Sequence, residues 1–421
     1  MGLMPNASHS SGLTRNDPFV IKGMVSMKAP LVLRSKGRFA LLVFAATHFV
    51  VDLASALLLF HFLTSFHLFA LCLLFYNFFA FAAEMPLGIA VDLWFRPQRF
   101  AALGCWLIVA TCLLCTGLAR TLGSSEVLAL VIAVMVGLGN GMFHVGAGAA
   151  VIRASAGRSA PLGVFVAPGA LGVFLGMLWG KSAGLLPLVS VVLLLLVCGL
   201  VIWVFMSAED LSGAAQLQEQ PQEQPQSQRL VRSARNAIVF SITGAVAVSL
   251  ACLCATVVLR SYAGFSFSFS WKTGALWPVA LVLGIVLGKI LGGFLGDSFG
   301  LKVAAVISLS GAAVLFLFPA VPVLGVLAVL LFNMTMPLTL RAIADRLPQA
   351  PGFAFGTLTF ALFAGALPML LGAAQVVRPG WSLALLSAAS LAIFFGALLV
   401  AEPAEPHAPG ANDQSAAGRE L

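Results

Sequence analysis

The chain has 421 residues, of which 60% are hydrophobic and only 9% are charged. A water-facing surface of this size needs far more charge, so the composition excludes a soluble globular protein. The net charge of +8 does not indicate a nucleic-acid partner, because the basic residues of a membrane protein gather in its cytoplasmic loops.

Apolar runs close to the ~20 residues that cross a ~30 Å hydrocarbon layer recur along the chain. The sequence lacks the ~10-residue alternating segments of a transmembrane β-barrel. We therefore predict an all-α polytopic membrane protein with twelve spans. In the first half they are expected at 39–60, 66–91, 100–119, 126–151, 160–180 and 185–207. In the second half they are expected at 236–262, 274–297, 301–319, 321–343, 352–376 and 381–401.

A polar stretch separates the two sets of six spans. It has Gln at every second position from Gln216 to Gln228, and it is typical of a solvated, flexible linker because it cannot bury a core. The expected organisation is a cytoplasmic tail at 1–38, a six-helix bundle at 39–208, a cytoplasmic Gln/Pro-rich linker at 209–235, a second six-helix bundle at 236–401 and a cytoplasmic tail at 402–421.

The distribution of basic residues predicts the orientation in the membrane. With both termini inside, the cytoplasmic segments hold 17 of the 23 Lys and Arg residues. The outer loops hold five, which are Arg120, Lys181, Arg260, Lys272 and Arg378. Under the positive-inside rule, this excess predicts cytoplasmic N and C termini. We expect no cleaved signal peptide before the first span.

A short motif occurs once in each half, after the second and after the eighth span. It consists of a glycine, an aspartate four residues later and a basic residue beyond a turn. The first copy contains Gly88, Asp92, Arg96 and Arg99, and the second contains Gly293, Asp297 and Lys302. Glycine lets two helices approach closely, and a carboxylate at a helix end can meet a basic group or the N-terminus of a neighbouring helix. We interpret these seven residues as conformational, or gating, residues.

The two copies resemble the signature loops of the major facilitator superfamily, although Ser298 follows the second aspartate where a basic residue is usual. The resemblance covers about residues 39–401. It implies two six-helix bundles related by pseudo-two-fold symmetry, a central cavity between them and alternating access by rocking.

Stretches of the first, fourth and fifth spans are similar to the fosmidomycin-resistance type of drug efflux proteins. That branch has a His and an Asp early in the first span, as in His48 and Asp52, and a Phe-His-Pro in the fourth, where this chain has Phe143, His144 and Val145. The fifth span also resembles the Gly-Pro stretch of drug–proton antiporters. The resemblance implies efflux and a bacterial inner membrane.

Ionisable residues inside the predicted spans are candidates for function, because a charge at mid-bilayer costs at least ~2.5–3.5 kcal/mol. Asp52 lies about midway along the first span, and His48 lies one helical turn before it on the same face. Such a pair can bind and release a coupling proton if it faces a cavity. Alternatively, Asp52 bonds a neighbouring helix and His48 lies near the inner surface.

Glu84 and Lys289 each lie eight residues before the aspartate of the motif, at equivalent places in spans 2 and 8. Eight residues correspond to about 12 Å of helix, so both are expected well inside the membrane. Either the two form an ion pair, or Glu84 carries a proton and Lys289 holds an anionic group of the substrate.

His144 and Asn333 are further candidates for substrate contact, although each can instead serve helix packing. Pro168, Gly169, Gly172 and Gly176 in the fifth span are candidate conformational residues. Glycines also recur every fourth residue in the eighth span, from Gly284 to Gly296. These stripes predict either sliding contact between spans 5 and 8 or tight packing within each bundle.

The sequence as a whole predicts a secondary active transporter of a small organic solute, with efflux by proton antiport as the leading hypothesis. Uptake of a small organic anion by symport or facilitated diffusion, and a non-transporting receptor or scaffold, stay open. We expect a functional monomer with no cofactor and no metal; the seven cysteines are expected to pack among the helices. The sequence has no Walker-type glycine loop, His-Glu-x-x-His pair or Ser/His/Asp arrangement, so we expect neither ATP-driven transport nor an enzyme.

Overall fold

The computed structural model describes residues 35–400, apart from 119–124, 183–184, 207–243 and 374. The predicted linker and C-terminal tail lie outside the described residues, as does all of the predicted N-terminal tail before Ser35. We refer to residues 35–206 as the first half and to residues 244–400 as the second half.

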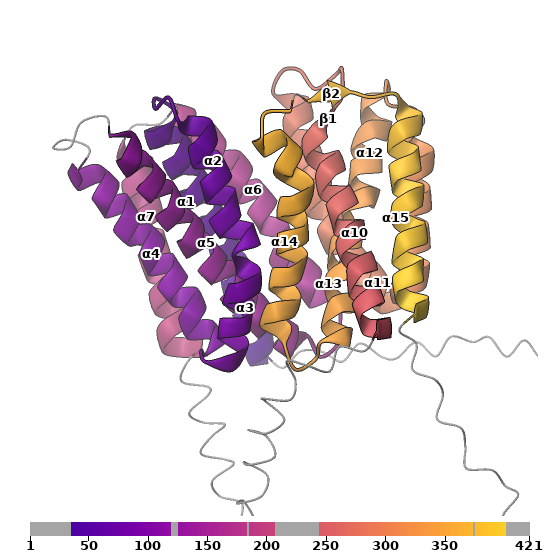
Figure 1. Ribbon diagram of the computed structural model, residues 1–421, viewed down its shortest axis with the longest axis horizontal. Coiled ribbons are helices and arrows are strands. Elements are labelled where there is room, and N and C mark those ends of the chain that lie inside the picture. Colours follow the sequence, from indigo (N-terminus) through magenta and orange to yellow (C-terminus); the bar gives the residue numbers. More distant parts are fainter. Residues whose placement is uncertain (1–34, 119–124, 183–184, 207–243, 374, 401–421) are drawn as a thin grey trace, which may run out of the picture. The chain divides into compact units, whose positions relative to one another are not determined.

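Helices make up nearly all of the described chain, which confirms the all-α fold (Figure 1). The first half contains α1 (Ser35–Leu58), η1 (Leu59–Leu63), α2 (Phe69–Asn77), η2 (Phe78–Ala82), α3 (Glu84–Leu93), α4 (Pro97–Leu118), α5 (Glu126–Ser155), α6 (Ala160–Ser182), α7 (Leu185–Val201) and η3 (Ile202–Met206). The second half contains α10 (Gly244–Ser266), α11 (Leu276–Phe316), α12 (Pro322–Asn333), α13 (Thr335–Arg346), α14 (Pro351–Leu370) and α15 (Gly380–Val400), with the two-residue parallel strands β1 (Phe267–Ser268) and β2 (Val376–Val377).

Local sequence explains where several helices begin and end. Helices α4, α12 and α14 each start at a proline, whose fixed φ suits the first helical turn and whose missing N–H is not needed there. Helix α5 is capped by the Ser125 hydroxyl, which accepts from the N–H of Leu128, and it ends where Ala156 and Gly157 adopt positive φ.

Within the described chain, ten helical stretches are long and apolar enough to cross a membrane, and Leu188–Val204 is a shorter apolar helix. Helix α11 has 41 residues, about 60 Å of helix, which is twice the thickness of a hydrocarbon core. Its backbone leaves the helical conformation at Gly300 (φ 80°, ψ 165°). The indole N–H of Trp271, just before α11, donates to the carbonyl of Pro319, just after it, at 2.7 Å. The chain therefore reverses at Gly300, and α11 contains two of the expected spans.

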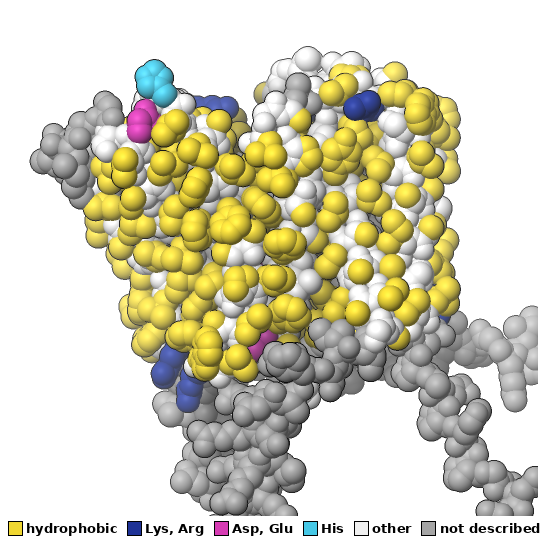
Figure 2. Space-filling view, in the orientation of Figure 1, with side chains coloured by type: hydrophobic (Ala, Val, Ile, Leu, Met, Phe, Trp, Pro, Cys, Tyr) yellow, Lys and Arg dark blue, Asp and Glu magenta, His cyan; other side chains and the backbone are white. Residues whose placement is uncertain are grey.

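The visible surface agrees with this membrane topology. Figure 2 shows hydrophobic side chains over the flanks of the helices and charged ones only near the two ends. The chain is therefore an integral, multi-pass membrane protein. We call the end that carries Asp92 and Asp297 the Asp92 face, and the opposite end, with Trp271 and Pro319, the Trp271 face.

The two halves pack against each other through a small set of helices. Helix α14 of the second half contacts α3 and α5, and helix α6 of the first half contacts α11 and α13. Figure 1 shows α14 beside α3, with its N-terminus at the Asp92 face. These helices bring the two copies of the sequence motif to the boundary between the halves.

Candidate functional site

Each motif aspartate caps a helix of the opposite half. The carboxylate of Asp92 accepts hydrogen bonds from the backbone N–H groups of Gly352 (3.0 Å) and Phe353 (2.8 Å) at the start of α14. The carboxylate of Asp297 accepts from the N–H groups of Ser159 (2.6 Å) and Ala160 (3.1 Å) at the start of α6. A carboxylate at a helix N-terminus meets unpaired donors and the positive end of the helix dipole, so both contacts hold the halves together.

An arginine of its own half accompanies each aspartate. Arg153 Nη2 lies 3.4 Å from Asp92 Oδ1, and Arg341 Nη1 lies 3.6 Å from Asp297 Oδ1. A basic group or a helix N-terminus was expected as the partner of each carboxylate, and the structure has both. The partner helices, α14 and α6, are findings of the structure.

The motif glycines are needed because backbone meets backbone at this boundary. A Cβ on Gly88 would collide with the carbonyl of Gly352, and one on Gly293 would lie 2.7 Å from the carbonyl of Ser159. The basic residues of the motif lie away from these contacts. Arg96 is exposed in the turn before α4, the Arg99 guanidinium stacks over Trp203 of its own half, and Lys302 follows the break at Gly300.

The glycine stripes pack mainly within each half. Gly172 and Gly176 of α6 face the backbone of α1, and the stripe of α11 faces α12 and α13. Spans 5 and 8 do meet across the boundary, as one alternative expected, because a Cβ on Gly163 of α6 would collide with the carbonyl of Lys289 in α11. That contact uses Gly163 and Gly293 rather than the predicted glycines of the fifth span.

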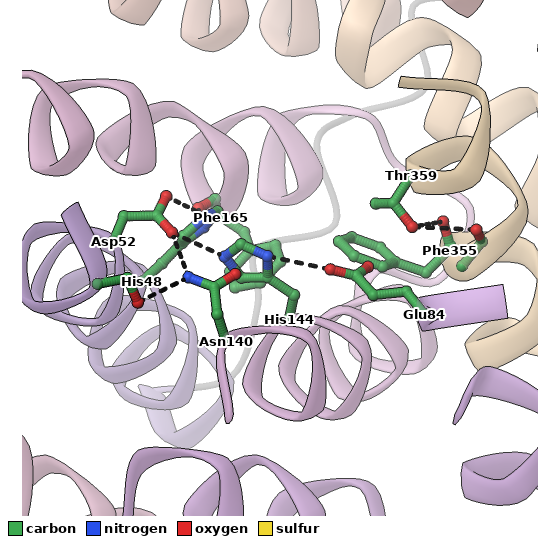
Figure 3. A network of polar contacts seen from close by, with 10 residues as sticks. His48, Asp52, Glu84, Asn140, His144, Phe165, Phe355 and Thr359 are labelled. Carbon is green, nitrogen blue, oxygen red and sulfur yellow. Dashed lines mark hydrogen bonds and ion pairs between the residues drawn. The ribbon is translucent and has the colours of Figure 1, made fainter. Parts of the chain in front are cut away.

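A buried network of polar side chains lies in the first half (Figure 3). Asp52 of α1 is at its centre. Its Oδ2 lies 3.3 Å from Nε2 of His48, and its Oδ1 lies 3.2 Å from Nε2 of His144 in α5. Nδ1 of His144 is in turn 3.1 Å from Oε1 of Glu84 in α3. The exposed fraction of each of these four residues is 6% or less, so water screens their charges poorly.

The second nitrogen of each histidine has an acceptor as its partner. Nδ1 of His48 lies 2.8 Å from the carbonyl oxygen of Phe165, and Nδ1 of His144 faces the Glu84 carboxylate. Since a carbonyl and a carboxylate accept, both Nδ1 atoms are assigned as donors, and both Nε2 atoms point at Asp52. A proton on either Nε2 is therefore attracted by Asp52.

Neighbouring small and polar residues shape this network. The amide of Asn140 donates to Asp52 Oδ1 at 3.0 Å and to the hydroxyl of Ser55 at 3.1 Å. A Cβ on Gly169 of α6 would collide with the carboxylate of Asp52 and lie 2.5 Å from Nε2 of His48. Gly169 thus leaves the space that the pair occupies, and Pro168, just before it, lies inside α6.

Glu84 connects the network to the second half. Its side chain is 0% exposed, and its Oε2 has no hydrogen-bond partner in the described part of the chain. It follows the π-helix η2, an irregular turn of the kind often found at functional sites. A Cβ on Gly356 of α14 would collide with the Glu84 carbonyl, and Figure 3 places Thr359 of α14 beside the Glu84 side chain.

The same cluster offers a set of metal ligands. Donor atoms of His48, Asp52 and His144 all lie within 4.8 Å of one another, and two imidazoles with a carboxylate form a donor set that divalent transition metals accept. No metal site was expected from the sequence, because sequence spacing alone does not bring His144 next to Asp52.

Lys289 and Asn333 lie elsewhere. Lys289 Nζ donates to the carbonyl of Val166 in α6 at 3.1 Å, and no ion pair with Glu84 occurs among the described residues. Asn333 donates to the carbonyl of Val329 in its own helix, at 2.8 Å. Of the two alternatives for Glu84 and Lys289, separate environments are therefore observed.

A cavity of about 530 Å³ lies between α6 of the first half and helices α10, α11, α12 and α15 of the second. Asn333 lines it, together with the basic residues Lys181, Arg260 and Lys272. The surface in Figure 2 is hollowed between the halves at the upper end, the Trp271 face.

The expectation that Arg260 lies in an outer loop is wrong. It is inside α10 and only 7% exposed. Arg260 falls within the predicted span 236–262 but was counted with the outer-loop residues, so it was not considered as a candidate for function.

Comparison with known proteins identifies the fold. No protein-family model matches the chain, and no curated protein matches its sequence. Among solved structures, the chain is similar to the major facilitator superfamily transporter FucP in the outward conformation, with a TM-score of 0.60 and 13% identity over 86% of this chain and 99% of that one. It is also similar to a second structure, of the E. coli fucose:proton symporter FucP (TM-score 0.56, 14% identity, 87% and 100% covered).

A third similar structure is the human organic anion transporter MFSD10, with a TM-score of 0.56 and 18% identity over 86% of this chain and 100% of that one. At these low identities the likeness shows the fold alone. The chain has the major facilitator fold, as the signature loops implied; its membership of the superfamily and of a branch within it stays a prediction.

Proposed function

We propose that the chain is a secondary transporter that exports a small organic solute in exchange for protons, by alternating access. The observation that carries the proposal is the buried network of His48, Asp52, His144 and Glu84. Two carboxylates and two imidazoles in an apolar interior are costly unless they are paired or used, and such groups inside a membrane protein commonly form proton relays.

The network is suited to hold and release protons. Asp52 lies between two imidazole nitrogens at 3.2 and 3.3 Å, and His144 lies between two carboxylates. Proton binding at either histidine adds a positive charge beside a carboxylate, and proton loss removes that charge from a poorly screened site. Each change in proton number therefore alters the electrostatic free energy of the first half.

The contacts between the halves supply a switch that these changes can bias. The Asp92 and Asp297 caps favour closure of the Asp92 face, and the cavity lies toward the opposite face. Rocking that breaks both caps would open the Asp92 face. Glu84 packs against α14, the same helix that Asp92 caps, so a change in charge at Glu84 acts directly on a helix that must move.

A second candidate function is uptake by proton symport. The similarity to the fucose:proton symporter favours it, while the Gly-Pro character of the fifth span favours export. The chemistry of the network serves both directions equally, because antiport and symport differ in the order of binding events and not in the groups that bind protons.

The test uses purified protein in liposomes that enclose a pH-sensitive dye. A panel of organic acids, sugars and amphipathic drugs is added, and substrate-dependent proton movement is recorded. We expect a signal that disappears in His144→Gln and persists in the matched control His67→Gln, whose histidine is exposed and outside the network. The sign of the signal separates antiport from symport.

Two results would contradict the proposal. Solute movement down its own concentration gradient, without any proton movement, would identify the protein as a facilitator. If no compound of the panel produces a signal although the wild-type protein is folded, the result would favour a receptor or scaffold that does not transport.

A further inference from the structure

The cavity between the halves contains an arginine that has no hydrogen-bond or ion-pair partner among the described residues. Arg260 lies on α10, six residues before the helix ends at the Trp271 face, and 7% of its surface is exposed. Its Nη1 is buried without a hydrogen-bond partner, and the ion pairs among the described residues do not include it. A buried guanidinium without an anion is unfavourable, so this geometry is suited to an anion from outside the chain.

The remaining charges of the cavity wall have the same sign. Lys181 at the end of α6 and Lys272 before α11 also line it, and the described residues of the lining include no acidic one. Three positive charges around one cavity attract anions and repel cations. Asn333 adds an uncharged amide at the wall.

Most of the wall is apolar, and much of it is aromatic. Phe174 and Met177 come from α6, and Phe267, Phe269, Phe316 and Phe332 come from the second half. A ligand with only polar groups would leave these rings without a partner, whereas a ligand with an apolar or aromatic body would bury them. A volume of about 530 Å³ is in the usual range for small-molecule sites, ~300–1,000 Å³.

We propose that this cavity binds an amphipathic organic anion, with its anionic group on the Arg260 guanidinium and its apolar body against the phenylalanine-rich wall. The planar guanidinium can donate two parallel hydrogen bonds to a carboxylate or a similar group, a geometry that an ammonium cannot provide. Lys181 and Lys272 contribute attraction nearer the Trp271 face. The inference rests on the proposed function, since it names the solute class for the transport cavity.

The test measures binding at equilibrium and uses three naphthalene derivatives of nearly equal size. They are 2-naphthoate, the neutral 2-naphthamide and the cationic 2-naphthylmethylammonium. The wild-type protein in a neutral detergent should bind the naphthoate at least ~10-fold more tightly than the amide, because hydrogen bonds between charged groups are stronger than those to a neutral amide. The cation should bind most weakly.

Three variants connect this preference to Arg260. Arg260→Gln should weaken naphthoate binding by ~10-fold or more and leave amide binding nearly unchanged. Arg260→Lys keeps the charge and should give an intermediate affinity, which also shows that a change at this position is compatible with folding. The matched control Arg378→Gln, an exposed residue at the same face, should bind like the wild type.

A second arm separates a soluble solute from a lipid as the source of the anion. The same titrations are repeated in nanodiscs of phosphatidylcholine with or without phosphatidylglycerol. If phosphatidylglycerol weakens naphthoate binding in the wild type but not in Arg260→Gln, a lipid headgroup occupies the site. If phosphatidylglycerol does not weaken naphthoate binding, the site binds a soluble anion.

Equal affinities for the three probes, or a naphthoate affinity that Arg260→Gln leaves unchanged, would overturn the proposal. The assay needs no proton gradient. A failure of proton coupling in liposomes and a failure of anion preference here are therefore separate results.

Discussion

The two halves differ in the charges that they bury. The first half encloses Asp52 and Glu84 with two histidines, whereas the second half encloses Arg260 and partly covers Lys289. By contrast, the caps at the boundary are alike, since each half provides an aspartate, an accompanying arginine and a helix N-terminus.

This comparison suggests a division of tasks. The shared caps are suited to a motion in which both halves take equivalent parts, and the unequal interiors are suited to different ligands. Carboxylates and imidazoles bind protons, and a guanidinium over an apolar cavity binds an anion.

Among variants outside the charged network itself, the largest effect is expected from Gly169→Ala. The added methyl group would overlap the space of Asp52 and His48, so the pair must separate or α6 must shift. We expect a loss of at least ~10-fold in proton-coupled transport, because small displacements in a preorganised site are costly. The matched control is Gly396→Ala, a helical glycine of α15 whose Cβ would meet nothing within 4 Å. Equal activity of the two variants would exclude a role for the close approach at Gly169.

Neutralising either cap aspartate should have an intermediate effect, and in both halves it should weaken closure of the Asp92 face. Asp92→Asn and Asp297→Asn each remove the charge at a helix N-terminus, which we expect to weaken closure of the Asp92 face by about 1–2 kcal/mol. The effect should be larger for Asp92, whose side chain is 8% exposed, than for Asp297, whose side chain is 22% exposed.

Spin labels at Trp94 and Gln349, exposed positions of opposite halves near the Asp92 face, can measure this closure. Each cap variant should increase the population with the longer distance between the labels. If this population increased in only one of the two variants, the caps would be alike in geometry but unequal in their contribution to the free energy of closure.

The smallest effect is expected from the arginines. Arg153→Gln and Arg341→Gln should each change the free energy of closing the Asp92 face, measured from the same distance distribution, by less than ~1 kcal/mol. The reason is that the two arginine side chains are 47% and 26% exposed and lie 3.4 and 3.6 Å from their aspartates. A shift larger than that of the aspartate variants would mean that the salt bridges, not the helix caps, hold the face closed.

Local spacing predicted the contacts that occur within one helix or at one helix end. The four-residue interval between His48 and Asp52 placed them on one face, and the motif aspartates were expected at helix ends with basic or N-terminal partners. These inferences need only the helical period and the charge of the group.

Contacts between distant helices could not be predicted in this way. His144 was expected to contact substrate, and the structure places it between Asp52 and Glu84, which lie 92 and 60 residues before it. Periodicity gave a face for the glycines of α6 but not the helix that they meet. Arg260 was missed because hydropathy alone does not distinguish a charge at the end of a span from one that faces a cavity inside it.

The most direct test of the account is a comparison of wild-type and Asp52→Asn protein in liposomes, with proton movement and solute movement recorded together. The account predicts that the wild type couples the two, and that Asp52→Asn exchanges solute across the membrane without moving protons or building a solute gradient. An Asp52→Asn protein that still drives solute against its gradient would contradict the assignment of the buried network as the coupling site.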